Sequence, residues 1–294
     1  MQTNTRTGFI GVGAMGMAMA RNLHRKGFAV AVRDIRAEAE EEARAFGMRV
    51  CTSPADMTRH ADLIVIVVVN AEQIEAVLFG ADGLATVPAE GKTVMLCSTI
   101  APEDTMRFAE KLAEHRISVI DAPISGGPAR AEAGSMSMML AAGSALLQRH
   151  AHVLDALSDK QFCISETPGD GAKAKLVNNL LAGVNLVAGA EAFALGMKIG
   201  LDPRKLFDVI CASSGMSWIF QDRMARVLQD DFEPCAFAHI LTKDITLATA
   251  MADNAGCQTP LGDAALDIFR KTVDNGWAQL DDAAVIKTYM KGAS

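Results

Sequence analysis

The sequence predicts an α/β fold in which an N-terminal Rossmann-type domain, built on a doubly wound parallel sheet, is followed by a C-terminal all-α domain. Up to about residue 165, short β-branched runs alternate with amphipathic stretches, a pattern typical of βαβ units. One run, Leu63–Val69, is apolar at every position, as expected of a strand covered on both faces. After Gly169 no convincing strand pattern remains. We therefore expect a first domain over residues 1–168 and a helical domain over residues 169–294, joined by a long buried helix.

The alternation places the expected elements of the first domain. The β-branched runs predict strands at Gly8–Ile10, Val30–Val32, Leu63–Val69, Val94–Cys97, Val119–Asp121 and Ser137–Leu140. Amphipathic spacing predicts helices that include Met15–Lys26, Ala37–Phe46 and Glu103–His115.

The second domain begins with a helix from Ala172 to about Ile199, which is apolar on nearly all sides and is therefore expected to be buried. Gly200 ends it, and Asp202 with Pro203 restarts a helix as N-cap and first helical residue. Further helices are expected at residues 217–228, 236–253, 260–274 and 282–290. Neighbouring helices could approach the long one closely at its three glycines, Gly183, Gly189 and Gly196.

Composition excludes several classes of protein. The net charge of −7 argues against a nucleic-acid partner, and 50% hydrophobic residues exclude a disordered chain. The longest unbroken apolar run has seven residues, well short of a membrane span, so no membrane partner is expected. The six cysteines form no CxxC pair and the six histidines lack ligand spacing, so neither a metal site nor a disulfide framework is expected. Reduced cysteines and the lack of an apolar signal segment favour a cytoplasmic location.

The glycine-rich segment Gly11-Val-Gly13-Ala14-Met15-Gly16 predicts a dinucleotide site, because it directly follows a strand and opens a helix. Gly11 permits the tight turn, Gly13 lets the backbone approach a pyrophosphate, and Gly16 lets helix and strand pack closely. The N–H groups at this helix start favour phosphate. The alternative is an ordinary strand-to-helix turn.

Asp34 stands at the end of the next strand, where an acid can accept hydrogen bonds from the ribose hydroxyls. Its charge would repel a 2′-phosphate, which favours NAD over NADP. Arg33 and Arg36 flank it and could tolerate that phosphate, so NADP stays possible.

Polar residues follow other predicted strands, where open α/β sheets bind ligands. Asn70 is expected beside the cofactor, and Thr99 could line its nicotinamide end. Ser125, Gly126 and Gly127 offer a hydroxyl and backbone N–H groups that suit a substrate carboxylate. Alternatively, the two glycines merely turn the chain.

The catalytic candidate is Lys175, near the start of the long apolar helix. It shares one helix face with Asn178 and Asn179, whereas Lys173 points elsewhere and is expected to be solvated. A lysine can take a hydroxyl proton as hydride leaves the same carbon, and amides can orient the substrate. The alternative is a surface lysine on the first helical turns.

These segments resemble the β-hydroxyacid dehydrogenases, the family that contains 3-hydroxyisobutyrate dehydrogenase and tartronate semialdehyde reductase. The matching segments are Phe9–Leu23, Ser98–Pro102, Asp121–Gly127, Gly169–Asn178 and Lys243-Asp244. The resemblance implies that Lys175 is the catalytic lysine and Asn178 its partner, with the substrate carboxylate at residues 125–127. It also implies that Thr99 and Lys243 contact the cofactor, and that a homodimer or homotetramer forms through the long helix.

Three further segments, Ser217–Met224, Asp281–Lys287 and Val69–Ala71, are similar to the L-threonate dehydrogenase branch. The resemblance therefore implies NAD-dependent oxidation of a small anionic hydroxy acid, with L-threonate and its 2-oxo acid as the expected pair. The alternatives are 3-hydroxyisobutyrate dehydrogenase, tartronate semialdehyde reductase and, from another class, a non-catalytic module that senses NAD.

Overall fold

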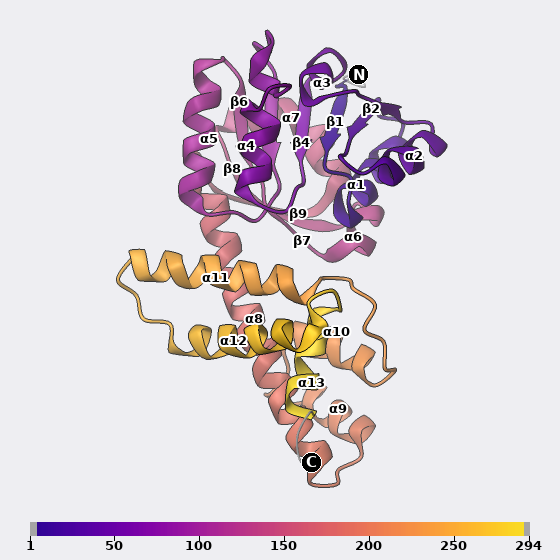
Figure 1. Ribbon diagram of the computed structural model, residues 1–294, viewed down its shortest axis with the longest axis vertical. Helices are drawn as coiled ribbons and strands as arrows, with labels where there is room; N and C mark the ends of the chain where they lie inside the picture. The colour runs from indigo at the N-terminus through magenta and orange to yellow at the C-terminus, as the bar shows by residue number, and fades with distance from the viewer. Residues whose placement is uncertain (1–4, 291–294) are drawn as a thin grey trace. The chain divides into compact units, whose positions relative to one another are not determined.

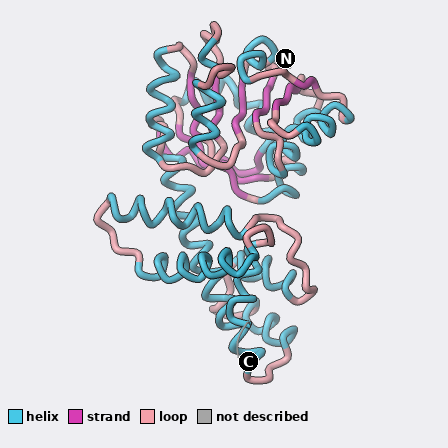
Figure 2. Tube along the Cα trace, in the orientation of Figure 1, coloured by secondary structure: helices cyan, strands magenta, loops and turns pink. Residues whose placement is uncertain are grey.

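The computed structural model describes residues 5–290, and these divide into two compact units with the boundary between Lys175 and Leu176 (Figure 1). Strands lie in the first unit (Figure 2). In the described part of the second unit, residues 176–290, β pairing is limited to one bridge between Phe237 and Asp281.

The first unit is built on one sheet in the order β3-β2-β1-β4-β5-β6-β8-β7, with β9 paired to β8. Its strands are β1 (Thr7–Ile10), β2 (Val30–Arg33), β3 (Arg49–Val50), β4 (Leu63–Ile66), β5 (Thr93–Leu96), β6 (Ser118–Asp121), β7 (Ile124–Ser125), β8 (Met136–Ala141) and β9 (Ser158–Ser165). The strands from β1 to β6 pair in parallel, and β8 runs antiparallel to β6 and β7. The order reverses at β1, between β2 and β4, which is the switch point where ligands bind in such sheets.

Helices cover both faces of this sheet. They are α1 (Ala14–Arg25), α2 (Ala37–Ala45), α3 (Pro54–His60), α4 (Ala71–Phe79), α5 (Pro102–Glu114), α6 (Gly127–Ala133) and α7 (Ser144–Leu157), with a 3₁₀ turn at Leu84–Thr86. Along β4, Leu63 and Val65 join the core on one face, whereas Ile64 and Ile66 join the core on the other. Burial on both faces explains why this strand is apolar at every position.

The expected strand Leu63–Val69 is three residues too long. The strand ends at Ile66, and the backbone N–H groups of Val68 and Val69 donate to the side chains of Ser98 and Gln73. Val69 is exposed. The apolar run therefore continues beyond the sheet into the connection to α4.

The second unit is helical. Its elements are most of α8 (Asp170–Lys198), then α9 (Pro203–Cys211), α10 (Trp218–Val227), α11 (Ala238–Asn254), α12 (Pro260–Thr272), a π-type turn (Val273–Trp277), a 3₁₀ turn (Asp282–Ala284) and α13 (Val285–Met290). Ser217 and Asp202 cap α10 and α9 by accepting backbone N–H bonds.

The glycines of α8 lie where its neighbours pack, as the sequence predicts. A Cβ at Gly183 would stand 2.4 Å from Ile245 of α11. One at Gly189 would stand 2.7 Å from the ring of Phe220 on α10, and one at Gly196 would stand 2.2 Å from Leu206 on α9. Each glycine makes room for a side chain of a different helix.

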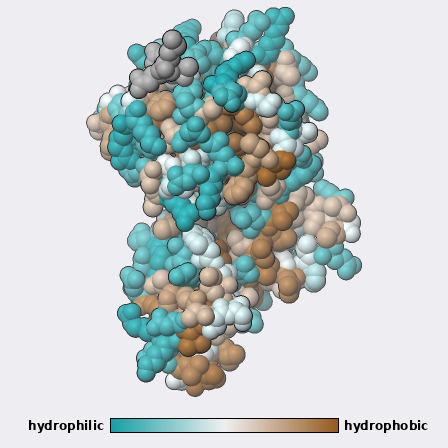
Figure 3. All heavy atoms as spheres, turned by 180° about the vertical axis from the view of Figure 1, so that it is seen from behind, coloured by the Kyte–Doolittle hydropathy of each residue, from teal (hydrophilic) through white to brown (hydrophobic). Residues whose placement is uncertain are grey.

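The expectation that this long helix is buried is wrong for one of its sides. Val177, Leu181 and Leu195 are each about 60% exposed (59%, 61% and 60%). Hydrophobic side chains gather on the surface of the second unit (Figure 3). The reason is geometric, because α9, α10 and α11 pack on the glycine positions and leave another side of α8 uncovered.

By length and composition alone, α8 is the one helix among residues 5–290 that could cross a membrane. Central helices of soluble proteins pass the same test, and three glycines of α8 face side chains of α9, α10 and α11.

Candidate active site

The glycine-rich turn between β1 and α1 has the geometry that its sequence predicts. Gly11 has a φ of +87°, which favours glycine, and a Cβ there would lie 2.4 Å from the carbonyl oxygen of Val67. A Cβ at Gly16 would lie 2.0 Å from the carbonyl oxygen of Gly11. These two glycines are therefore required by the turn itself.

Gly13 differs from both. Its φ of −69° and ψ of −164° are open to most residues, and the nearest atom to a Cβ would be a guanidinium nitrogen of Arg36 at 3.8 Å. The fold thus leaves free space at this position. Within the described chain no side chain caps α1, so the N–H groups of its first turn, which contains Ala14 and Met15, can bind an anion. This open backbone fits the pyrophosphate of a dinucleotide.

Asp34 lies beside this turn and is 7% exposed. Its Oδ2 accepts the N–H of Val12 at 2.7 Å, and its Oδ1 accepts the N–H of Arg36 at 2.9 Å. Burial alone would raise the pKa of Asp34, but the hydrogen bonds from Arg36 and Val12 outweigh burial and hold the pKa below its usual value. The carboxylate is therefore charged at neutral pH, and it also fastens the glycine turn to the β2–α2 connection.

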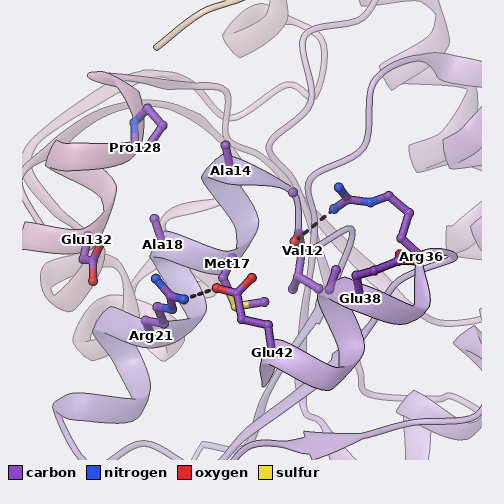
Figure 4. Close-up of a pocket in the computed structure, with 12 residues that line it drawn as sticks. Val12, Ala14, Met17, Ala18, Arg21, Arg36, Glu38, Glu42, Pro128 and Glu132 are labelled. Atoms are coloured by element: carbon purple, nitrogen blue, oxygen red, sulfur yellow. Dashed lines mark hydrogen bonds and ion pairs between the residues drawn. The ribbon is translucent and has the colours of Figure 1, made fainter. Parts of the chain in front are cut away.

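Both arginines that flank Asp34 have carboxylate partners. Arg33 pairs with Glu40, and the Nε of Arg36 lies 3.2 Å from Oδ1 of Asp34. Arg36 also donates to the carbonyl oxygen of Val12 at 3.3 Å (Figure 4).

A cavity of about 340 Å³ opens beside this turn (Figure 4). It is bordered by the glycine turn, α1, α2 and α6, and its charged lining residues are Arg21, Arg36, Glu38, Glu42 and Glu132. Arg21 and Glu42 form an ion pair within it. The cavity thus combines charged side chains with apolar ones such as Met17 and Pro128 beside the glycine turn.

The residues that follow the other strands are held by local hydrogen bonds. Asn70 caps α4 by accepting the N–H of Gln73 at 2.9 Å, so part of its role is structural. Thr99 follows Ser98, whose hydroxyl accepts the N–H of Val68 at 3.0 Å. Both segments therefore have a fixed backbone.

Ser125 lies in β7, paired with Ser137 of β8. Gly126 and Gly127 have φ values of +137° and +74°, so they do turn the chain into α6. A Cβ on Gly127 would meet nothing within 4 Å. The turn therefore also has an open side, and the two interpretations of these glycines are compatible.

Lys175 is 7% exposed and is the last residue of the first unit. Asn178 lies one helical turn further along α8 and is exposed, whereas Asn179 is 8% exposed. Lys173 is exposed and pairs with Asp170 at 2.7 Å, in line with the expectation that it is solvated. The two lysines of this motif therefore differ in burial, since Lys175 is buried and Lys173 is exposed.

In the second unit, a chain of polar contacts links α8 to α11. The Nδ2 of Asn178 donates to Asn179 Oδ1 at 3.1 Å, and the Nδ2 of Asn179 donates to Asp244 Oδ2 at 2.7 Å. Lys243 lies 2.8 Å from the other carboxylate oxygen of Asp244. Asp244 therefore fixes the amide of Asn179, which in turn fixes the amide of Asn178.

Two of the buried carboxylates for which the sequence predicts no role contact residues of α8. Asp244 is 4% exposed and bonds to Asn179, and Asp121 is 1% exposed and bonds to Ala172. The sequence signal that could identify such residues is an acid within an otherwise apolar helix face or strand. A buried charge is costly without partners, so its presence indicates a role.

Two family models match successive parts of the chain. The NAD binding domain of 6-phosphogluconate dehydrogenase matches residues 6–165. The model described as NAD-binding of NADP-dependent 3-hydroxyisobutyrate dehydrogenase matches residues 169–289.

Full-length relatives agree with these models. An L-threonate dehydrogenase from Cupriavidus necator is 39% identical over 282 residues, which cover 96% of this chain and 95% of that protein. A 2-hydroxy-3-oxopropionate reductase from Escherichia coli is 31% identical and covers 96% of each chain. The crystal structure of a 3-hydroxyisobutyrate dehydrogenase from Salmonella typhimurium superposes with a TM-score of 0.88 at 36% identity, covering 96% of this chain and 98% of that one.

The chain belongs to the 3-hydroxyisobutyrate dehydrogenase family. Like the members of this family, it is an oxidoreductase that acts on a hydroxy acid and uses NAD or NADP. The Rossmann-type sheet followed by a helical domain confirms the fold class expected from the sequence.

Proposed function

We propose that the protein oxidises L-threonate to its 2-oxo acid, with NAD as the preferred cofactor and Lys175 as the general base. The observation that carries the proposal is a buried lysine one helical turn before Asn178, on a helix that starts beside a dinucleotide-binding sheet. The named relatives that favour this substrate include the L-threonate dehydrogenases, at 35–39% identity over nearly the whole chain.

The cofactor binds in residues 1–168, at the turn of Gly11, Gly13 and Gly16, with Ala14 and Met15 at the helix start. Asp34 receives the ribose hydroxyls, and its charge at neutral pH disfavours a 2′-phosphate. Arg33 and Arg36 already have carboxylate partners, which further favours NAD. Asn70, Thr99 and Lys243 complete the proposed set of cofactor contacts.

The bound nicotinamide supplies the acceptor for the hydride that leaves the hydroxyl-bearing carbon. The neutral amine of Lys175 takes the hydroxyl proton during oxidation, and its ammonium returns that proton to the forming alkoxide in reduction. Ser125, Gly126 and Gly127 hold the substrate carboxylate with a hydroxyl and backbone N–H groups.

Asn178 orients the substrate beside Lys175. Its amide is held by Asn179, which is in turn held by Asp244. In this proposal Asn179 belongs to the substrate site through Asn178, and the helical domain, residues 169–294, supplies this polar group.

We also propose that two copies of the chain associate through α8 as a homodimer or homotetramer. The support is the apolar side of α8, where Val177, Leu181 and Leu195 are exposed in the single chain. Stable oligomers bury such surfaces because their exposure to water is costly. Light scattering after gel filtration should give the mass of two or four chains, and a monomer at micromolar concentration contradicts this point.

The mechanism is tested by Lys175→Ala. The turnover number should fall about 10³-fold, within the range attributed to a positioned acid or base, while NADH affinity measured by fluorescence stays within about twofold. Lys173→Ala is the matched control, since this exposed lysine lies two residues earlier on the same helix, and its turnover should stay at the wild-type level. Full turnover by Lys175→Ala would refute the proposed base.

The substrate is tested by following NADH formation with L-threonate, erythronate, 3-hydroxyisobutyrate, glycerate and serine. L-Threonate should give the highest kcat/KM. A higher value with 3-hydroxyisobutyrate, or reduction of tartronate semialdehyde as the fastest reaction, would move the protein to another branch of the family. NADH binding without turnover of any of these acids would support a non-catalytic sensor.

A further inference from the structure

Asp121 is a buried carboxylate at the end of β6, the last parallel strand of the sheet's main run. Its Oδ2 accepts the backbone N–H of Gly169 at 2.8 Å and that of Ala172 at 3.1 Å. Both donors lie at the start of α8. The carboxylate therefore caps this helix from the sheet, and Lys175 lies one helical turn after Ala172.

The other side of Asp121 is fixed by the sheet. Asp121 pairs in register with Leu96 of β5, and the N–H of Ala122 donates to the carbonyl oxygen of Leu96 at 2.9 Å. The chain then continues through Pro123, whose carbonyl oxygen accepts the N–H of Met139 at 3.0 Å, to Ser125. The side chain of Asp121 thus joins two starting points: that of the segment leading to Ser125–Gly127, and that of the helix carrying Lys175.

Packing around this contact leaves no room for a side chain at residue 171. A Cβ on Gly171 would lie 2.9 Å from Oδ2 of Asp121 and 2.8 Å from the carbonyl oxygen of Met139. Gly169 has a φ of +102°, a conformation that favours glycine. The two glycines of the Gly169-Asp-Gly171 motif therefore allow the helix backbone to reach the carboxylate.

Keeping a carboxylate here is costly for the fold. Burial raises the pKa of Asp121 to about 6, although the N–H bonds from Ala172, Gly169 and Gly171 oppose that rise. A serine or asparagine could cap a helix without a buried charge. A residue that lowers the stability of the fold is expected where its geometry is needed by a functional site.

We propose that Asp121 is a positioning residue that sets Lys175 relative to the carboxylate-binding segment Ser125–Gly127, by tying the start of α8 to the end of β6. This inference rests on the proposed role of Lys175 as general base. A base and a carboxylate site must act on two groups of one small substrate, and a shift of about 1 Å between them can lower the rate about 100-fold.

The test compares Asp121→Ala, Asp121→Asn and Asp170→Asn, with the hydroxy acid that the wild-type enzyme turns over fastest. Asp121→Ala should lower kcat at least tenfold and raise KM for the hydroxy acid, while NADH affinity stays within about threefold. Asp121→Asn keeps an acceptor oxygen of the same size and should recover most of the lost kcat. Asp170→Asn removes a carboxylate from the same helix start without touching the buried contact, and its kcat should match the wild type.

Two results would overturn the proposal. One is a folded Asp121→Ala protein with wild-type kcat and KM. The other is a parallel loss of NADH affinity and kcat, which would make Asp121 a support of the whole sheet domain. If Asp121→Ala does not fold, Gly171→Ala tests the same contact by forcing a Cβ against the carboxylate, and wild-type kcat in that protein would equally overturn the proposal.

The Lys175→Ala background separates this inference from the proposed function. If Asp121 acts through Lys175, adding Asp121→Ala to Lys175→Ala should lower the residual rate no further. A further tenfold fall would contradict the positioning role while leaving Lys175 as the base. Full turnover by Lys175→Ala alone would instead contradict the proposed function.

Discussion

Two sets of glycines, one in each unit of the molecule, serve different purposes. In the first unit, Gly11 and Gly126 give the backbone a positive φ, and Gly13 borders free space. In the second unit, Gly183 and Gly189 lie inside a regular helix and leave space for side chains of other helices.

The difference separates a glycine that is required by packing from a glycine that packing does not require. A Cβ at Gly189 would collide with a ring of the same unit, whereas a Cβ at Gly13 would meet no atom closer than 3.8 Å. Replacing the first should therefore damage stability, and replacing the second should damage binding.

Gly13→Val should weaken NADH binding about a thousandfold, or about 4 kcal/mol, because a branched side chain would block the approach of the pyrophosphate to the backbone. The melting temperature without cofactor should stay near the wild-type value, since the backbone at this position suits valine. Fluorescence titration and thermal melting measure the two quantities. Unchanged NADH affinity would show that Gly13 does not face the cofactor.

The two units also differ in the kind of polar group that they bury. Measurements of stability at acidic pH should reveal the contribution of the group in the first unit. In the first unit, burial, together with the neighbouring charges of Arg149 and His152, lowers the pKa of His150 to about 4, and its Nε2 lies 2.9 Å from the hydroxyl of Thr93. In the second unit, a buried arginine, Arg223, is paired with Asp282.

Because the folded state holds His150 neutral, the unfolded state binds more protons between about pH 6.5 and pH 4. The contribution of His150 is complete above pH 6.5, and about 3 kcal/mol is lost as the pH falls towards 4. Urea unfolding at several pH values should show this loss as a difference between the wild type and His150→Asn, because the raised pKa of Asp121 has the opposite effect on stability in both proteins. The free energy of unfolding should fall less on acidification from pH 6.5 to 4.5 in His150→Asn than in the wild type, and an equal change in both proteins would rule out a contribution of His150.

Gly189→Val should lower the free energy of unfolding by about 2 kcal/mol, because the added methyl groups force the buried ring of Phe220 out of its place. NADH affinity should not change, since this glycine packs against Phe220 and is not among the proposed cofactor contacts. Urea unfolding and fluorescence titration provide the comparison with Gly13→Val. If Gly189→Val were as stable as the wild type, the close approach of α8 and α10 would not need glycine.

The sequence identified most of what depends on short stretches of chain. The strands from β1 to β6, apart from β3, start within one residue of their expected positions, because buried strands carry short, mainly apolar runs. β9 was not predicted, since Asp159 to Ile164 are exposed and show no apolar alternation. The two-residue strands β3 and β7 are too short to leave a pattern.

The site was predictable in its residue types and less so in its connections. Lys175, Asn178 and the glycine turn stand in local motifs. The bond from Gly169 to Asp121 spans 48 positions of the chain and that from Asn179 to Asp244 spans 65. No periodicity links such distant residues. The exposed side of α8 was missed because hydrophobicity alone does not tell how many neighbours a helix has.

The double attachment of Asp34 has a consequence for how cofactor use can evolve or be engineered. This residue accepts backbone N–H groups from Val12 and Arg36, so it is both the proposed reader of the ribose and a fastening of the glycine turn. Replacement by alanine removes the charge and leaves both N–H groups without their acceptor, whereas asparagine or serine removes the charge and keeps one acceptor oxygen. A change towards NADP through Asp34 therefore alters the stability of the glycine turn together with cofactor preference.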